Sequence, residues 1–482
     1  MKRSFLINIT LLLLANLLIK PFYLFGIERK LQYIVGNIEY GHYYNVLSFT
    51  LILQFINDFG IQNYTSRLIS QNRIDANTHA KSLVSFKLIL SFFYLILTFI
   101  VAGLWYGSKL DLSLVMHLTL NQILISLIFF LRSNISGLGL YRTDTLLSIL
   151  DRSLLILMMG SLIYFSDHRE WINISLFVWI QTISLAICVV LSVVILVYNK
   201  YHFKIITISY SEFKSILNIC LPFALIYISS VFFMKSESIW LEKLLYNGVE
   251  ESGIYASCFR LYDALCILAL SFSALLLAMF ANLYSDSERL KELLSLSIRI
   301  LFVIAIFCSL FGIFYINEIS QMLNTNSNSY SNNIFILLLL AFIPGSINYI
   351  FGAYYQACHK EKTLVKIYFT IAIISIALNF ITIPTYRAQG SAFAYLCSQI
   401  ILFIISIYLI RNDLSLLFKE KIKILLFCLS LILLFYLISS YSGLHFYFQV
   451  LILSLGTLLI LFLTRVIEIN QVKKLWSMKN NS

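Results

Sequence analysis

The sequence is poor in charged residues and in proline. Asp, Glu, Lys and Arg make up only 12% of the 482 residues, and four residues are proline. A soluble protein of this length needs a polar surface that this composition does not supply, so a water-soluble globular protein is excluded. The sequence also has no Gly-rich phosphate loop, no HExxH and no GxSxG motif. ATP-binding, zinc-hydrolase and serine-hydrolase sites therefore have no motif to support them.

The eight cysteines form no CxxC pair, and all lie within apolar segments or at their edges. They are Cys188, Cys220, Cys258, Cys266, Cys308, Cys358, Cys397 and Cys428. We interpret them as small hydrophobic residues at helix contacts. We therefore expect no disulfide, no metal site and no cofactor.

Long apolar segments dominate the chain. Hydrophobic residues make up 60% of it and form runs of roughly 19 to 29 residues, whereas about 20 suffice for a membrane-spanning helix. A β-barrel would instead show alternating segments of about 10 residues. We predict an all-α polytopic membrane protein with about fourteen transmembrane helices. The predicted spans are 5–26, 43–62, 82–105, 114–136, 145–165, 172–198, 214–234, 254–282, 292–316, 333–357, 363–384, 390–410, 421–439 and 446–466.

The distribution of Lys and Arg residues predicts the orientation of the chain in the membrane. The first apolar run follows Met1-Lys2-Arg3 and has no small-residue cleavage site after it, so we interpret it as a retained span. With the N-terminus inside, 24 Lys and Arg residues lie in inner segments and seven in outer loops. This bias predicts that both termini are cytoplasmic. It also accounts for most of the net charge of +12, so no nucleic-acid partner is needed.

A short pattern, G-x-x-E-x-G-x-Y, occurs twice, each time in a predicted outer loop that enters a span. The copies are Gly36-Asn37-Ile38-Glu39-Tyr40-Gly41-His42-Tyr43 and Gly248-Val249-Glu250-Glu251-Ser252-Gly253-Ile254-Tyr255. Their offset of 212 residues equals a displacement of about six predicted spans. An even displacement gives two halves of equal orientation, related by a pseudo-two-fold axis along the membrane normal. We expect an N-lobe at 1–205, a C-lobe at 206–415 and a peripheral helix pair at 416–482.

Several segments resemble one branch of a known transporter superfamily. They are Gly41-His42-Tyr43-Tyr44, Asn57-Asp58-Phe59-Gly60-Ile61 and on to Arg67, Lys235-Ser236-Glu237, Leu241-Glu242-Lys243-Leu244, Gly253-Ile254-Tyr255-Ala256 and Arg260-Leu261-Tyr262-Asp263. They are similar to the polysaccharide-transport branch of the multidrug/oligosaccharidyl-lipid/polysaccharide exporter superfamily, whose best-known members are the Wzx-type O-antigen flippases. Two departures stand out. Lys235-Ser236-Glu237 replaces a frequent Arg-x-Asp, and no proline precedes Met279-Phe280.

The resemblance implies a bacterial inner-membrane flippase for an undecaprenyl-pyrophosphate-linked oligosaccharide, such as an O-antigen or capsule unit. The glycan would cross a cationic central cavity by alternating access, coupled to an H⁺ or Na⁺ gradient. Implied partners are the lipid-linked oligosaccharide, membrane lipids and glycan polymerase machinery. A lipid II flippase and a multidrug or cation antiporter of the same superfamily are alternatives. A polytopic glycan polymerase is a further one, but the longest outer loops, around 235–253 and 317–332, are short for an enzyme site.

Basic residues within the predicted spans are the candidate substrate-binding residues. A charge at the bilayer centre costs roughly 2.5–3.5 kcal/mol, so it normally faces a cavity or a partner. The candidates are Lys20, Arg152, Arg260 and Arg299, with Lys235 beside them. A guanidinium suits a pyrophosphate or an acidic sugar. The alternatives are an internal ion pair for Arg260 and snorkelling to the membrane surface for Lys20 and Arg299.

Three acidic residues are the candidates for ion coupling. Asp263 follows Arg260 by one helical turn and can pair with it. Asp58 lies near the inner end of its span, where helix capping or solvation at the loop is favoured over ion coupling. Glu237 completes the set.

Overall fold

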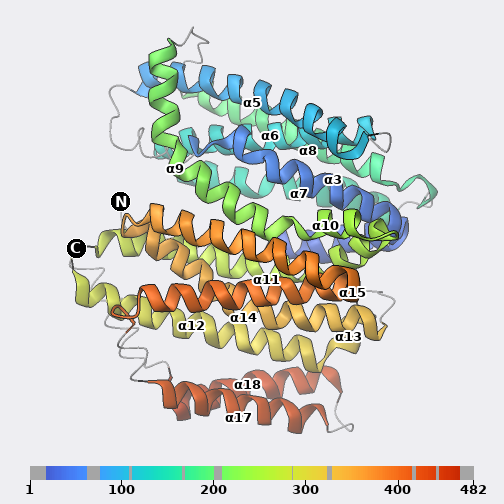
Figure 1. Ribbon diagram of the computed structural model, residues 1–482, viewed down its shortest axis with the longest axis vertical. Coiled ribbons are helices and arrows are strands. Elements are labelled where there is room, and N and C mark those ends of the chain that lie inside the picture. The colour runs from blue at the N-terminus through green and yellow to red at the C-terminus, as the bar shows by residue number, and fades with distance from the viewer. Residues whose placement is uncertain are drawn as a thin grey trace. The chain divides into compact units, whose positions relative to one another are not determined.

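A computed structural model describes residues 18–61, 76–107, 111–165, 169–199, 209–284, 286–322, 328–414, 420–440 and 445–466. Within these ranges the chain is helical and contains no β-strand. Figure 1 draws the described residues as coiled helical ribbons joined by short connections. Because a helix satisfies its own backbone hydrogen bonds, this architecture suits an apolar chain in lipid. The prediction of an all-α membrane protein is confirmed.

Most long helices begin and end close to the predicted spans. In chain order they are α3 (Asn37–Asp58), α5 (Ala76–Tyr106), α6 (Leu112–Gly137), α7 (Tyr141–Phe165), α8 (Ile174–Tyr198), α9 (Tyr210–Lys235), α11 (Gly248–Asn282), α12 (Ser287–Phe314), α14 (Ser329–Ala357), α15 (Glu361–Leu409), α17 (Lys421–Ser439) and α18 (Phe446–Thr464).

Ten of the described helices are long and apolar enough to span a membrane, or eleven if the two parts of α9 count as one span. Two features reconcile this number with about fourteen predicted spans. First, α15 contains a break at Arg387, where φ is 52° and ψ is −130°, so it covers two predicted spans. Second, α3 is not apolar enough to be counted, and most of the first predicted span lies outside the described residues.

Several short helices were not predicted. The first span continues into a π-helix, η1 (Tyr23–Glu28), and then into α2 (Arg29–Val35). The helix α10 (Glu237–Leu244) follows α9, and α13 (Ile316–Met322) follows α12, while a 3₁₀ turn, η3 (Arg169–Trp171), precedes α8. Each is too short for a hydropathy window of membrane length to detect.

The chain divides into two compact units. Unit 1 contains residues 1–257 and 368–388, and unit 2 contains residues 258–367 and 389–482. These boundaries fall inside α11 and α15, so each of these helices contributes to both units. The predicted division into lobes at 205 and 415 stays a prediction.

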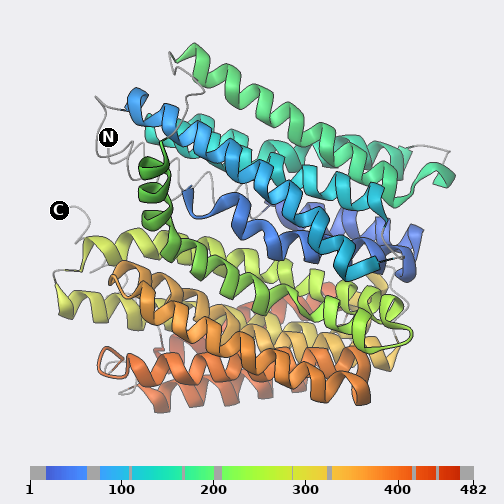
Figure 2. The same cartoon turned by 45° about the horizontal axis from the view of Figure 1, so that its top comes forward.

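Unit 1 is built around α3, which packs against α5, α6 and α9, while α6 packs against α8. Figure 2 shows these helices from a second direction. A core cluster that includes Phe86, Phe130 and Cys220 joins them. The helix α9 bends by 50° between Leu221 and Phe223, where the intervening proline removes a backbone donor.

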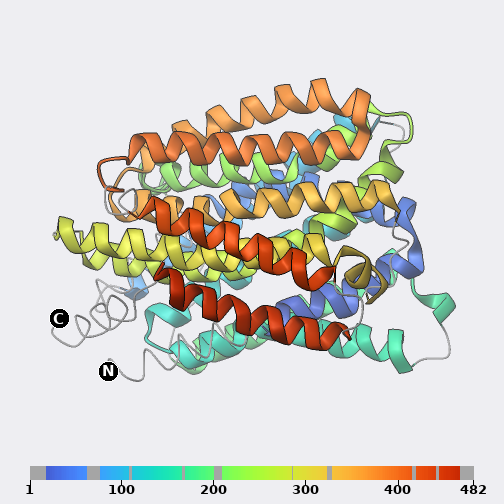
Figure 3. The same cartoon turned by 90° about the horizontal axis from the view of Figure 1, so that it is seen from below.

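Unit 2 contains the pair α12 and α14 and, packed against α12, the C-terminal hairpin of α17 and α18. Figure 3 shows α17 and α18 side by side. Buried Phe427, Leu431 and Phe435 of α17 join Leu453 of α18 and Val303 of α12 in one core cluster. The hairpin is therefore attached by an apolar face.

Candidate functional site

The first charged cluster of unit 1 lies at the π-helix η1. A π-turn widens the helix and often marks a functional position. The Arg152 guanidinium of α7 lies over the Tyr23 ring of η1, 4.6 Å from its centroid, an arrangement that favours a cation. Its Nε is 3.3 Å from Asp151 Oδ2. The side chain of Arg152 is 26% exposed, so it is partly buried.

Lys20 and Glu28 lie beside Arg152 and Asp151. These four residues, with Tyr23, are called the arginine cluster below. The charges of Arg152 and Asp151 act on the half-buried ammonium of Lys20. Glu28 is buried and accepts a hydrogen bond of 2.8 Å from the Tyr40 hydroxyl, and its charge acts on Arg152. The structure thus brings together two of the predicted substrate-binding residues, Lys20 and Arg152.

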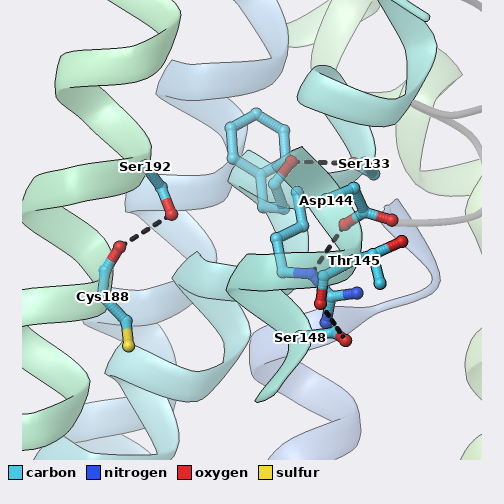
Figure 4. Close-up of polar contacts among 8 residues, drawn as sticks. Ser133, Asp144, Thr145, Ser148, Cys188 and Ser192 are labelled. Atoms are coloured by element: carbon cyan, nitrogen blue, oxygen red, sulfur yellow. Dashed lines mark hydrogen bonds and ion pairs between the residues drawn. The ribbon is translucent and has the colours of Figure 1, made fainter. Parts of the chain in front are cut away.

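A second ion pair adjoins this cluster on α6 and α7. Arg132 Nε donates to Asp144 Oδ1 at 2.7 Å, and the charge of Arg132 also acts on Lys20. Figure 4 shows Asp144 close to Thr145 and Ser148 of α7 and to Ser133 of α6. With this pair included, the site contains three basic and three acidic side chains, whose formal charges cancel. They are Lys20, Arg132, Arg152, Glu28, Asp144 and Asp151. The site is thus nearly neutral when empty, and an anion that enters it competes with carboxylates for the same donors.

Lys87 is a buried cation that the sequence analysis did not identify. Its side chain is 1% exposed, and its ammonium donates to Asn57 O at 2.6 Å, to Asn57 Oδ1 at 2.9 Å and to Ser126 Oγ. These contacts use all three donors of an ammonium group. They also satisfy one of the free carbonyl groups at the C-terminal end of α3. Lys87 therefore joins α3, α5 and α6.

The 24 basic residues counted in inner segments include Lys87, which stands near the start of the predicted span 82–105. Its position a full helical turn inside an apolar run was a signal that could have identified it.

Asp58 is the last residue of α3 and lies close enough to Lys87 for the two charges to interact. Gly60 follows with a φ of +74°, and a Cβ there would be 2.5 Å from Phe223 Cβ. Only glycine allows this approach to the bend of α9. The predicted ion-coupling residue Asp58 thus stands at a fixed turn beside a buried lysine.

Glu237 begins α10, two residues after Lys235, and is only 1% exposed. Neither carboxylate oxygen has a hydrogen bond of normal geometry, although the Ser375 hydroxyl and the Lys235 charge both act on it. Burial raises the pKa of Glu237 to about 8. Asn379, one turn along from Ser375, donates to the Ser375 carbonyl at 2.9 Å and leaves its own Oδ1 buried without a partner.

In unit 2, Arg260 Nη1 lies 3.9 Å from Asp263 Oδ2, and both side chains are largely buried. The predicted pairing of these two residues is present. The intervening Tyr262 belongs to a buried polar network in which Tyr395 and Gln399 also take part. The network fixes the helix that carries Arg260 and Asp263.

Arg299 stands apart from the other predicted substrate-binding residues. It is 5% exposed, forms an ion pair with Glu420 and donates to the carbonyl of Val466 at 3.0 Å. Its Nε also donates to Ser295 O, one turn earlier on α12, at 3.3 Å. These contacts attach both ends of the C-terminal hairpin to α12.

One pocket of about 190 Å³ opens at the beginning of α6 and α8. Its lining includes Glu39, His42, Asp111 and His117. His42 Nε2 is 3.9 Å from Asp111 Oδ2, and the His117 ring packs on Trp179. Among the described residues, no group of three or more His, Cys, Asp or Glu side chains has the arrangement of a metal site.

Two family models match the sequence, and each covers more than half of it. A model described as polysaccharide biosynthesis protein matches residues 5–283. A model described as lipid II flippase MurJ matches residues 182–464. No match exists among curated proteins.

Several solved structures are similar to this chain. A lipid II flippase MurJ in an inward closed conformation has a TM-score of 0.68 at 15% identity, covering 96% of this chain and 98% of that one. A MOP superfamily transporter from Pyrococcus furiosus has a TM-score of 0.60 at 14% identity, covering 85% and 96%. An outward-facing MATE multidrug transporter has a TM-score of 0.57 at 15% identity, covering 86% and 96%. At these identities the likeness establishes the fold.

Proposed function

Because this chain belongs to the polysaccharide biosynthesis and MurJ families of MOP superfamily transporters, we propose that it moves lipid-linked oligosaccharides across the bacterial inner membrane. The proposed substrate is an undecaprenyl-pyrophosphate-linked glycan unit that passes from the inner to the outer leaflet. Both chain ends lie in the cytoplasm, as the distribution of basic residues predicts.

The arginine cluster of unit 1 carries this proposal. A pyrophosphate needs donors of fixed charge, and a guanidinium keeps its proton at every physiological pH. Of the donors of Arg152, the described contacts use only Nε, so the other nitrogens can bind a phosphate in the bidentate manner. Tyr23 holds the guanidinium plane. The aromatic face beside it suits a sugar ring as well.

Asp151 and Glu28 act as counter-ions in the empty site. Without substrate they stabilise Arg152 and Lys20, which would otherwise be uncompensated charges in a poorly solvated site. A pyrophosphate replaces them as the counter-charge and is released when the carboxylates pair again. Binding by exchange of counter-ions avoids the high cost of an empty cationic cavity.

The test is export of surface glycan in a bacterium that lacks its own flippase. Expression of the chain should restore surface glycan and remove the lipid-linked intermediate that accumulates on the inner leaflet. Restoration of growth in a strain depleted of its lipid II flippase, without glycan export, would instead favour the lipid II activity suggested by the MurJ match over residues 182–464. Failure in both strains would contradict the proposal.

The site around Glu237 supports a cation-coupled mechanism. A buried carboxylate without a hydrogen bond of normal geometry and a buried amide oxygen without a partner are hard ligands of the kind that Na⁺ accepts. Because the pKa of Glu237 is about 8, the carboxyl is mostly protonated at neutral pH, and a bound cation must displace that proton. H⁺ and Na⁺ therefore compete for one group.

We expect the apparent Na⁺ affinity of the purified protein to rise about tenfold per pH unit below the pKa and to level off above it. The measurement is the Na⁺-dependent increase in melting temperature between pH 6 and pH 9, since a ligand of the folded state stabilises it. Choline chloride at equal ionic strength is the control for salt.

Glu237→Gln should abolish the Na⁺ effect, and Glu250→Gln, at an exposed position of α11, should retain it. A pH-independent Na⁺ effect that persists in Glu237→Gln would place the cation elsewhere. An absence of any Na⁺ effect in the unaltered protein would leave H⁺ as the coupling ion.

A further inference from the structure

The two copies of the G-x-x-E-x-G-x-Y pattern contact each other in the structure, and both lie in unit 1. A Cβ on Gly41, the second glycine of the first copy, would be 2.1 Å from the carbonyl oxygen of Val249. A Cβ on Gly253, the second glycine of the second copy, would be 2.0 Å from the carbonyl oxygen of Asn37. Val249 and Asn37 are both the second residue of their own copy.

This contact is reciprocal, as a two-fold axis requires. Each glycine meets the same backbone group of the opposite copy, so the backbones of α3 and α11 are in direct contact at this crossing. Close crossings of this kind depend on glycine and are accompanied by Cα–H contacts to carbonyl oxygens.

Buried polar side chains form hydrogen bonds that stabilise the crossing of α3 and α11. Gln32 Nε2 donates to the carbonyl of Gly253 at 3.0 Å, and the hydroxyl of Ser252 bonds to Asn45 Oδ1. All four of these residues are inaccessible or nearly so, with Asn45 and Ser252 at 0% exposed. These hydrogen bonds are therefore shielded from water.

The second copy of the motif makes an additional ion pair and hydrogen bond, both through Glu251. The carboxylate of Glu251 lies 3.6 Å from Arg387 Nη1 and accepts from the backbone N–H of Ala388 at 3.4 Å. Arg387 is the residue at which α15 breaks. The crossing is thus connected to the point where one long helix of the second half changes direction.

We infer that the two motif copies form the outer closure of the transport path, and that Gly41 and Gly253 are the residues that permit it to close. The inference rests on the proposed function, because a closure is needed only where a path alternates between two sides. Closed, α3 and α11 seal the end at which both motifs are predicted to face outward. Opening separates the glycine contact and breaks the Gln32 and Ser252 hydrogen bonds.

The test measures the seal directly. The parent carries Ser252→Cys in the full-length protein, and its reaction with a membrane-impermeant maleimide is followed in open membrane fragments, where both faces are accessible. In Gly41→Ala or Gly253→Ala, the new methyl group collides with backbone that cannot rotate away. We expect the cysteine at position 252 to react several-fold faster than in the parent. Gly103→Ala, where a Cβ meets nothing within 4 Å, should change nothing.

The buried native Cys188 and Cys220 report global unfolding, since they become reactive only if unit 1 opens as a whole. If these two cysteines react in the Gly41→Ala and Gly253→Ala variants, those variants are unfolded. Gln32→Ala then serves as the test variant, because it removes a hydrogen bond without inserting atoms. Faster reaction at position 252 with Cys188 and Cys220 silent supports the closure. A rate equal to that of the parent in Gln32→Ala and in every folded glycine variant overturns it. Labelling needs no substrate, so the result stands even if glycan export is never restored.

Discussion

Surface-glycan export is expected to fall about tenfold or more when Arg152 is replaced by alanine. A hydrogen bond to a charged group contributes about 1.5–3 kcal/mol, and about 1.4 kcal/mol already corresponds to tenfold in a rate. The alanine removes the guanidinium that lies over Tyr23 and leaves Asp151 without its cation. Arg152→Lys keeps the charge but loses the planar fork, so we expect partial export.

Export is measured as surface glycan in a strain without its own flippase, with the amount of protein in the membrane determined by immunoblot. Arg289→Ala is the matched control, because Arg289 is 54% exposed and pairs only with Asp286 on the surface of α12. Asp151→Asn should reduce export less than Arg152→Ala, since it weakens a counter-ion and not the anion-binding group. Normal glycan from a well-expressed Arg152→Ala protein would remove Arg152 from substrate binding.

The second large effect is expected at Arg299, and it concerns stability. Arg299→Ala removes the partner of Glu420 and leaves the carbonyl of Val466 without its donor. Breaking a buried ion pair on one side costs about 3–5 kcal/mol, a substantial part of the stability of a folded domain. We expect a clear fall in the melting temperature of the detergent-solubilised protein and faster proteolysis of the hairpin α17–α18.

A double variant separates the ion pair from simple packing. Arg299→Met combined with Glu420→Met replaces both charges by apolar side chains of similar size, and such replacements of buried pairs are often close to neutral. The double variant should therefore be more stable than Arg299→Ala. The surface pair Arg289 and Asp286 again serves as control, because an exposed pair contributes about 1 kcal/mol or less. An Arg299→Ala protein as stable as the unaltered chain would contradict the assigned role.

Much of the fold could be predicted because lipid imposes one rule on every span. An apolar run of sufficient length has to be helical, and its ends coincide with polar residues that cap helices, such as Asp111, Asn173 and Asp286. The rule does not apply to α10 or η1. Those segments are short, and their conformation depends on contacts with distant helices and not on their own composition.

The candidate site could be predicted only in part. A basic residue in an apolar run indicates a buried charge, which identified Lys20, Arg152 and Arg260. It does not reveal the partner of that charge. Glu420 is 121 residues from Arg299 along the chain, and no local pattern connects them. Lys87 was missed for a related reason, because its ligands at Asn57 and Ser126 come from other helices.

The offset of 212 residues that relates the two motif copies also relates Lys87 to Arg299. Each is a buried basic residue, on α5 and α12 respectively. Lys87 finds its acceptors on α3 and α6, within its own repeat, whereas Arg299 takes its counter-charge from the C-terminal hairpin. The two positions thus share a buried positive charge but differ in the groups that neutralise it. The C-terminal hairpin therefore has an electrostatic role besides its apolar contact with α12, because it supplies the carboxylate that neutralises Arg299.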